Sequence, residues 1–240
     1  MPKIGCISPS IVQLPWDLGD FLPSSVSAIV ATLNNRNGKP GEEERSNAAL
    51  PGAVNVLADE GAGAIVALGI PNAARRGFAA DQKLFRDLGR ERDVPIVSSL
   101  MATVLACLHL GVRHALLVTQ YADADNDRIV SYCREAGLAV DAAVGLGCRN
   151  AAEVNAKGPA DYDALARATL PRFPQCDALV IFARGNMASI ARTLEDETNI
   201  PVIEQTQATV WWSFSQFGLA TPAGHGKLLA WVAAPTVVTA

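Results

Sequence analysis

The feature that most constrains the fold of this 240-residue chain is a pattern that occurs twice. Residues 93–97 (DVPIV), followed by ATV at 102–104, return as 199–203 (NIPVI), followed by ATV at 208–210, at a constant offset. The alternative is that any two strand–helix units look alike, since V/I-P-V/I is a common strand start. We favour duplication, which predicts two similar halves in one chain.

Short apolar runs lie around these repeats and end in turn residues. Each has four or five residues without polar alternation, which is typical of strands buried on both faces of a parallel sheet. They are Ile4–Ile7, Ala64–Leu68, Ala115–Val118 and Ala178–Phe182. The runs at 64 and 178 also belong to a repeated pair, GAIV at 63–66 and DALV at 177–180.

Stretches with helical character separate the runs. They are Glu43–Glu60, Asp127–Ala136 and Asp161–Leu170, with Gly137 at a helix C-terminus. Repeated strand–helix units form right-handed crossovers and a sheet covered on both sides. We therefore expect an α/β fold of two halves with parallel sheets, related by a pseudo-twofold axis. The expected halves are 1–96 with 216–240, and 97–215, with the active-site cleft between them.

Composition excludes several classes of partner. The net charge of −4 leaves no basic face for a nucleic acid. The five cysteines show no CxxC spacing, so we expect neither disulfides nor a metal site. Glycine-rich dinucleotide and phosphate motifs are absent from the sequence, and we expect no cofactor. The start resembles a strand rather than a signal peptide, and no apolar run could span a membrane, so we expect a cytoplasmic protein without membrane contact.

Polar and small residues follow the expected strands. They are Ser8, Pro9 and Ser10; Gly69, Ile70, Pro71 and Asn72; Thr119 and Tyr121; Ala183, Arg184, Gly185 and Asn186; and Glu204 and Gln205. Ligands of parallel α/β sheets bind beyond the carboxyl ends of the strands. Two halves that face each other would place these turns in one cleft, where neutral donors and helix N-termini suit a small carboxylate or an enolate.

Several of these residues have a simpler interpretation. Asn72 and Asn186 could cap helices, Tyr121 could be ordinary packing, and Arg184 could be a solvated surface residue. His225 is the one histidine expected in a loop, and a catalytic role is its less favoured interpretation.

Order and spacing of these pieces give the chain a family resemblance. The matching segments are IGCISPS at 4–10, AIVALG at 64–69 with RG at 76–77, LMATV at 100–104, LVTQY at 117–121, DALVIFA at 177–183 and GHGKLL at 224–229. The chain resembles the aspartate/glutamate racemase superfamily, and within it the arylmalonate decarboxylase and maleate isomerase branch. The resemblance implies a racemase-like fold and identifies Tyr121 with the active-site tyrosine of the family.

This chain differs from the families that it resembles at the two positions of their catalytic cysteines. Racemases place one cysteine from each half on opposite sides of the substrate carbon, and arylmalonate decarboxylases keep only the second, as a proton donor. Gly69 occupies the first position in this chain and Ala183 the second. Without a thiolate, two-base racemisation and cysteine addition to maleate are not expected.

We therefore expect a cofactor-independent lyase or isomerase that acts on a small carboxylic or dicarboxylic acid through an enolate-like intermediate, with decarboxylation favoured. Tyr121, Arg184 or a bound water would supply the proton. The alternative is a catalytically altered carboxylate-binding or accessory protein of a catabolic pathway. A weaker third possibility is an interaction role, because Trp211, Trp212, Phe214 and Phe217 form an aromatic helix face whose default role is core packing but which could also join copies of a homo-oligomer.

Overall fold

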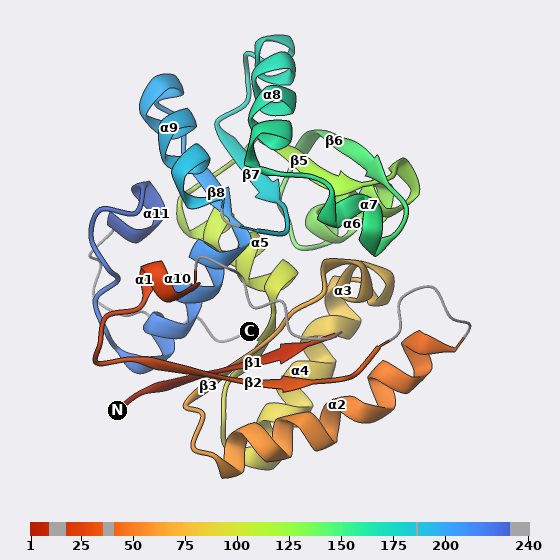
Figure 1. Ribbon diagram of the computed structural model, residues 1–240, viewed down its shortest axis with the longest axis vertical. Helices are drawn as coiled ribbons and strands as arrows, with labels where there is room; N and C mark the ends of the chain where they lie inside the picture. Colours follow the sequence, from red (N-terminus) through yellow and green to blue (C-terminus); the bar gives the residue numbers. More distant parts are fainter. Residues whose placement is uncertain (10–17, 36–40, 186, 231–240) are drawn as a thin grey trace.

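The computed structural model describes residues 1–9, 18–35, 41–185 and 187–230, and two candidate site residues, Ser10 and Asn186, lie outside them. The first of two parallel four-stranded sheets has the strand order β2-β1-β3-β4. Its strands are β1 (Lys3–Ser8), β2 (Ser27–Thr32), β3 (Ala64–Ala67) and β4 (Ile96–Ser98). It forms the lower half of the molecule in Figure 1.

The second sheet has the same arrangement, with the order β6-β5-β7-β8. Its strands are β5 (Ala115–Tyr121), β6 (Val140–Cys148), β7 (Ala178–Phe182) and β8 (Val202–Glu204). The repeated segments occupy equivalent places, since β3 and β7 lie third in their sheets and β4 and β8 lie at one edge. The predicted α/β fold with two similar parallel-sheet halves is confirmed.

Helices follow most strands and cover both sheets. They are α1 (Leu18–Phe21), α2 (Glu42–Asp59), α3 (Ile70–Arg76), α4 (Phe78–Arg92), α5 (Ser99–His109), α6 (Asp123–Glu135), α7 (Ala151–Asn155), α8 (Pro159–Thr169), a 3-10 turn η1 (Leu170–Arg172), α9 (Ala188–Thr198), α10 (Gln205–Phe217) and α11 (Lys227–Ala230). The three predicted helical stretches correspond to α2, α6 and α8. Gly137 follows α6 with a positive φ of 90°, as a helix C-terminus requires.

Two segments differ from the sequence prediction. Thr119 and Tyr121 were expected in a turn after a strand that ends at Val118, but β5 continues to Tyr121. Residues 69–72 were expected as a turn, but α3 begins at Ile70, directly after Gly69. Pro71 favours this start, because a proline in the first helical turn needs no backbone N–H partner. Asn72 therefore lies inside α3 and does not cap it.

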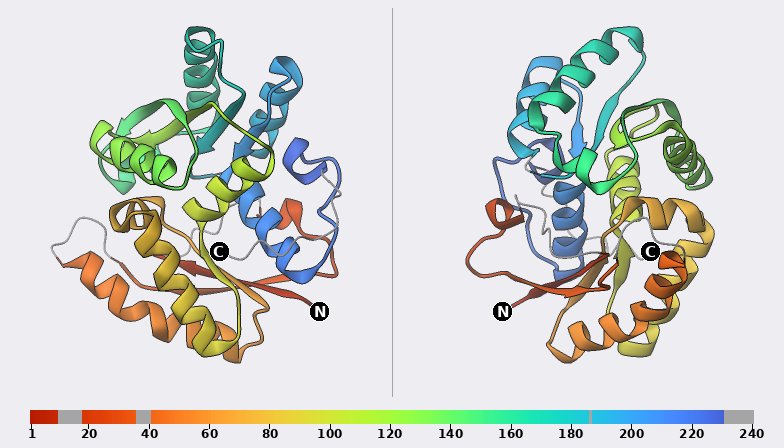
Figure 2. Two further views of the ribbon diagram at one scale, coloured as in Figure 1. Left: turned by 180° about the vertical axis from the view of Figure 1, so that it is seen from behind. Right: turned by 45° about the vertical axis from the view of Figure 1, so that its right-hand side comes forward.

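The central core lies between the two sheets, around α5 and α10. Buried side chains of both sheets and both helices form one cluster there, among them Val66, Val180, Met101 and Trp212. The two helices contact each other, and each also contacts a strand of the sheet that it does not follow: α5 follows β4 and contacts β8, and α10 follows β8 and contacts β3. Figure 2 shows both running through the middle of the molecule. Two further clusters fill the outer faces, under α2 and α4 and under α8 and α9.

The aromatic residues of α10 belong to this core. Trp211, Trp212 and Phe214 are buried, and Phe217 packs against the same cluster. Homo-oligomerisation stays a prediction.

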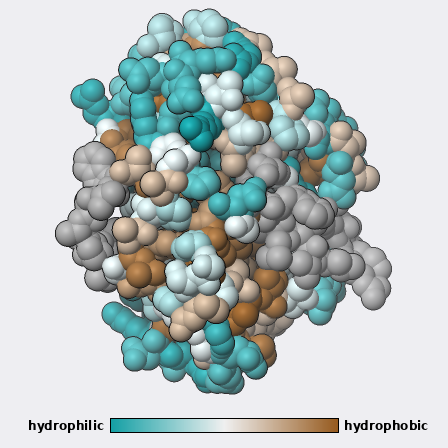
Figure 3. All heavy atoms as spheres, turned by 60° about the vertical axis from the view of Figure 1, so that its left-hand side comes forward, coloured by the Kyte–Doolittle hydropathy of each residue, from teal (hydrophilic) through white to brown (hydrophobic). Residues whose placement is uncertain are grey.

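In the view of Figure 3, hydrophilic residues cover the upper part of the face and hydrophobic residues gather below its middle. Within the described ranges, no helix combines the length and apolarity needed to cross a membrane.

Candidate active site

Strand ends of both sheets meet at a small cavity of about 100 Å³. Its lining residues lie at or beyond the carboxyl ends of β1, β3 and β4 in the first sheet and of β5, β7 and β8 in the second. They are Ser8, Pro9, Leu68, Gly69, Ile70, Ser99, Gln120, Tyr121, Ala183, Arg184, Gly185, Gln205 and Thr209. Residues far apart in the sequence thus share one hollow, in the place where parallel α/β sheets bind ligands.

Nine of the residues expected in the cleft line this cavity: Ser8, Pro9, Gly69, Ile70, Tyr121, Ala183, Arg184, Gly185 and Gln205. Pro71 and Asn72 do not. They lie in α3, where Oδ1 of Asn72 accepts a hydrogen bond of 3.5 Å from Arg75. Thr119 and Glu204 also point elsewhere, since Thr119 donates to Asn126 and Glu204 accepts from the start of α10.

Two glycines shape the turns after β3 and β7. Gly69 has a φ of 113° and Gly185 a φ of 103°, which side chains with a Cβ rarely adopt. A Cβ at Gly69 would also lie 3.4 Å from Cγ of Pro9. Glycine therefore lets both turns bend sharply and leaves backbone at the cavity wall.

Arg184 carries the one charge among the residues that line the cavity. Its Nη1 donates a 3.0 Å hydrogen bond to Oδ1 of Asn155, the last residue of α7. Because the Asn155 amide is uncharged, this hydrogen bond positions the guanidinium and leaves its positive charge uncompensated. The cavity therefore combines a single positive charge with neutral walls, which favours an anion.

Tyr121 ends β5 at the cavity. Burial raises the pKa of its phenol, and the opposing influences of the Gln120 side chain and the Arg184 charge are smaller. The hydroxyl therefore stays protonated at neutral pH and can act as a hydrogen-bond donor. Nearby, Tyr162 donates to Oε1 of Gln120 over 3.3 Å, and burial raises the pKa of Tyr162 to about 12.

Sequence reasoning missed Ser99, Gln120 and Thr209 as lining residues. Ser99 is buried, and its Oγ has no hydrogen-bond partner among the described residues. The repeat held a signal for two of them: Ser99 stands at the position of Gln205 in the other half, and Thr209 at that of Thr103. Gln205, which was expected at a strand end, donates to the carbonyl oxygen of Ala183 over 2.6 Å.

Of the helices that begin at the cavity, α5 and α10 carry side-chain caps, whereas α3 has none at Gly69. Oγ of Ser98 accepts from the N–H of Met101 at the start of α5. The Glu204 carboxylate accepts from the N–H groups of Thr206 and Gln207 at the start of α10. Because Glu204 is negative, it offsets the positive end of α10. Arg184, rather than these helix ends, therefore supplies the positive charge.

The five cysteines lie away from the cavity. Cys6, Cys107, Cys133, Cys148 and Cys176 are buried, and none of them lines it. Burial raises the pKa of every one of these thiols, to about 12 for Cys6 and for Cys133. A thiol with such a pKa stays protonated near neutral pH and is a poor nucleophile.

Neither a histidine nor a group of metal ligands is among the residues that line this cavity. The ring of His225 packs 4.8 Å from that of Phe21, and its carbonyl oxygen accepts from Gln207. Within the described ranges, no group of three or more His, Cys, Asp or Glu side chains could hold a metal ion.

Comparison with known structures places this geometry in a known fold. A glycine/cysteine double mutant of arylmalonate decarboxylase in the liganded form matches with a TM-score of 0.85 and 21% identity, over 95% of this chain and 98% of that one. The maleate isomerase from Pseudomonas putida S16, as a cysteine-to-alanine variant with maleate, matches with a TM-score of 0.85 and 20% identity, over 95% and 97%. The Nocardia farcinica maleate cis-trans isomerase with a covalently bound succinylcysteine intermediate matches with a TM-score of 0.84 and 21% identity, over 95% and 98%.

The sequence itself identifies the family. A search among curated proteins finds no match. A family model described as arylmalonate decarboxylase matches residues 46–229, which include β3, β7 and most of the residues that line the cavity. The chain therefore belongs to the arylmalonate decarboxylase family.

Proposed function

We propose that the chain is a cofactor-independent lyase that decarboxylates a small dicarboxylic acid through an enolate-like intermediate. One observation carries the proposal: strand ends of both halves enclose a cavity with a single guanidinium, neutral donors and no thiol. Decarboxylation needs charge stabilisation and no base, whereas racemisation and maleate isomerisation in the related families use cysteines.

Arg184 binds the carboxylate that remains on the substrate. The second carboxylate then lies against the apolar part of the wall, near Pro9 and Ile70. Loss of hydration destabilises that anion and favours cleavage of its bond to the α-carbon. Carbon dioxide leaves, and the bonding electron pair passes to the retained carboxylate, which becomes an enediolate. Arg184 and the neutral donors around it stabilise the added charge.

Tyr121 then delivers a proton to the α-carbon. Its raised pKa keeps the phenol protonated, and an enediolate is a strong enough base to take the proton. The tyrosinate recovers its proton from water. We assign Ala183 to the position of the cysteine that performs this step in related decarboxylases, so we expect slow and stereochemically loose protonation.

The test incubates the protein with methylmalonate, phenylmalonate and maleate and follows carbon dioxide release and product by NMR. Arg184→Gln should lower kcat/KM about a hundredfold, because it removes the charge that stabilises the intermediate. Arg192→Gln is the matched control, since Arg192 is exposed and bonds to the carbonyl of Gly224. Equal activities of the two variants would remove Arg184 from the mechanism.

Tyr121→Phe separates the proposed steps, with Tyr162→Phe as its control. We expect loss of product formation with substrate binding retained. A Tyr121→Phe variant with unchanged turnover and product stereochemistry would overturn the role of Tyr121.

Ala183→Cys adds a thiol at the cavity wall and should accelerate protonation. An Ala183→Cys variant without any gain would contradict the position assigned to Ala183.

The alternative function is a binding protein that keeps the carboxylate pocket without chemistry. The absence of a cysteine from the cavity wall favours it over a racemase. A carboxylate that raises the Tm of the protein while no product forms would assign this alternative.

A further inference from the structure

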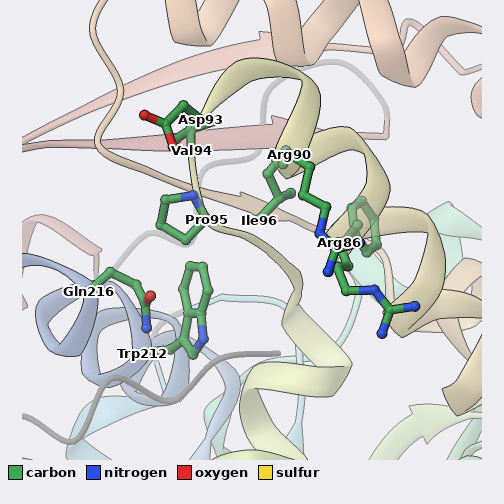
Figure 4. Close-up of a pocket in the computed structure, with 10 residues that line it drawn as sticks. Arg86, Arg90, Asp93, Val94, Pro95, Ile96, Trp212 and Gln216 are labelled. Carbon is green, nitrogen blue, oxygen red and sulfur yellow. The ribbon is translucent and has the colours of Figure 1, made fainter.

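A second cavity lies at the opposite end of β4 from the candidate active site. It has a volume of about 250 Å³, larger than the first, and opens beside the segment that enters β4. Figure 4 shows Arg86 and Arg90 approaching it from α4, with Trp212 and Gln216 of α10 on the other side.

The floor of this second cavity is apolar. Phe85, Val94, Ile96 and Trp212 line it and are all buried. The Trp212 ring lies next to Pro95 (Figure 4). Flat aromatic and aliphatic surfaces of this kind bind the apolar part of a small molecule.

The rim of the second cavity carries two positive charges. Arg86 and Arg90 lie one helical turn apart on α4, and both are exposed. Neither forms an ion pair or a side-chain hydrogen bond with any residue that the structure describes. Like charges at this spacing destabilise a helix, and a bound anion would relieve the repulsion. Asp93 is the one acidic residue that lines the cavity.

The two cavities share elements without sharing residues. On α10, Gln205 and Thr209 line the first cavity, and Trp212 and Gln216 line the second. On the other side, β4 runs from Ile96 in the second cavity toward Ser99 in the first. The second cavity is therefore a separate place and not a branch of the first.

We infer that the second cavity is a binding site for a small organic carboxylate, whose apolar body rests on Trp212 and whose carboxylate pairs with Arg90 and Arg86. Guanidinium groups pair with carboxylates through two parallel hydrogen bonds, and the buried aromatic floor selects an apolar body. The inference does not depend on the chemistry of the first cavity.

Isothermal titration calorimetry with phenylacetate as the probe tests this inference. The double variant Arg86→Gln/Arg90→Gln should bind at least about tenfold more weakly than the unaltered chain. Lys83→Gln is the matched control, because it removes a positive charge from the exposed face of α4 without touching the cavity. Phenylacetamide, which has the same ring without the charge, and acetate, which has the charge without the ring, should both bind more weakly than phenylacetate.

The location of the probe is checked separately. In NMR spectra, phenylacetate should shift the indole signal of Trp212, and Arg184→Gln should leave the affinity measured from that signal unchanged. Binding that Arg184→Gln abolishes and Arg86→Gln/Arg90→Gln leaves intact would place the probe in the first cavity and overturn the inference. Failure of phenylacetate to bind at millimolar concentration would also overturn it.

Discussion

The buried carboxylate of Asp81 is held by hydrogen bonds from three neighbouring side chains. Its carboxylate has no exposed surface and accepts bonds of 2.8 and 2.6 Å from Arg76, 2.5 Å from Ser98 and 2.8 Å from Tyr132. Burial and the negative charge of Asp81 both raise the pKa of Tyr132, which keeps the phenol a donor. A buried charge of this kind is tolerated only while its donors remain.

Arg76→Gln should therefore lower the free energy of unfolding by about 3–5 kcal/mol, since it leaves the Asp81 charge without its cation. Arg75→Gln is the neighbouring control. Arg75 forms a partly exposed ion pair of 3.6 Å with Asp125, and its loss should cost about 1 kcal/mol or less. Urea unfolding measures both. Similar losses for the two variants would show that Arg76 is not the essential partner of Asp81.

Gly145 in β6 supports Tyr121 at close range. A Cβ at Gly145 would lie 1.9 Å from the carbonyl oxygen of Tyr121 and 2.7 Å from Nδ2 of Asn126. Gly145→Ala must displace the end of β5, and we expect a loss of about 1–3 kcal/mol in urea unfolding. Gly19→Ala, in α1, meets nothing within 4 Å and serves as the control. Equal stabilities would contradict the close approach.

The sequence predicted strand ends well and side-chain partners poorly. Short apolar runs located Ser8 and Gly69 at strand ends, because polar or turn residues often follow a buried strand. The run Ala115–Val118 stopped three residues short, since β5 continues through the buried polar residues Thr119 and Gln120 to Tyr121. Asp81 carried no signal, since two of the three residues that bond to it, Ser98 and Tyr132, are distant in sequence. Ser99 was missed for the same reason: its burial depends on how the halves pack.

At the scale of elements, α4 approaches the entry to β4 through a glycine. A Cβ at Gly89 would lie 2.6 Å from the carbonyl oxygen of Val94, so only glycine fits. Gly89→Ala should lower the free energy of unfolding by about 1–3 kcal/mol. Gly52→Ala, in the middle of α2 with nothing within 4 Å, should instead raise it by up to about 1 kcal/mol. If Gly89→Ala and Gly52→Ala change the free energy of unfolding in the same direction, the close approach of α4 to Val94 is not what limits residue 89.

The repeat predicted the order of the strands and helices along the chain, but it did not predict that α5 and α10 each contact the sheet that they do not follow. Equivalent sequences at β4 and β8 follow from duplication. The contacts of α5 with β8 and of α10 with β3 do not, because an apolar helix face such as that of α10 does not identify its partner. The start of α3 at Ile70 was missed since proline and glycine are signals for turns as well as for helix starts.

At the scale of the whole molecule, the buried thiols predict sensitivity to alkali. A thiol has an ordinary pKa of 9.0, and burial raises that of Cys6 and of Cys133 to about 12. Above pH 9 the unfolded chain loses these protons and the folded chain keeps them, so the unfolded state binds fewer protons. The free energy of unfolding should then fall with rising pH, by about 1.4 kcal/mol per pH unit and group at most.

Urea unfolding between pH 7.5 and 10.5, under reducing conditions, measures this slope. Below about pH 8 the thiols should contribute no slope. Cys6→Ala should reduce the slope above pH 9 by one group. A profile that stays flat above pH 9 would show that these thiols ionise as readily in the folded chain as in the unfolded one.

The contacts between α4 and α6 limit how the two sheets can move. Glu135 of α6 accepts hydrogen bonds of 2.8 and 3.1 Å from the N–H groups of Phe78 and Ala79 at the start of α4, and Tyr132 of α6 reaches Asp81. A straight separation of the halves would break all three bonds. A rotation about the line through these contacts would keep these three bonds, so they restrict the angle between the sheets less than they restrict the separation of the sheets.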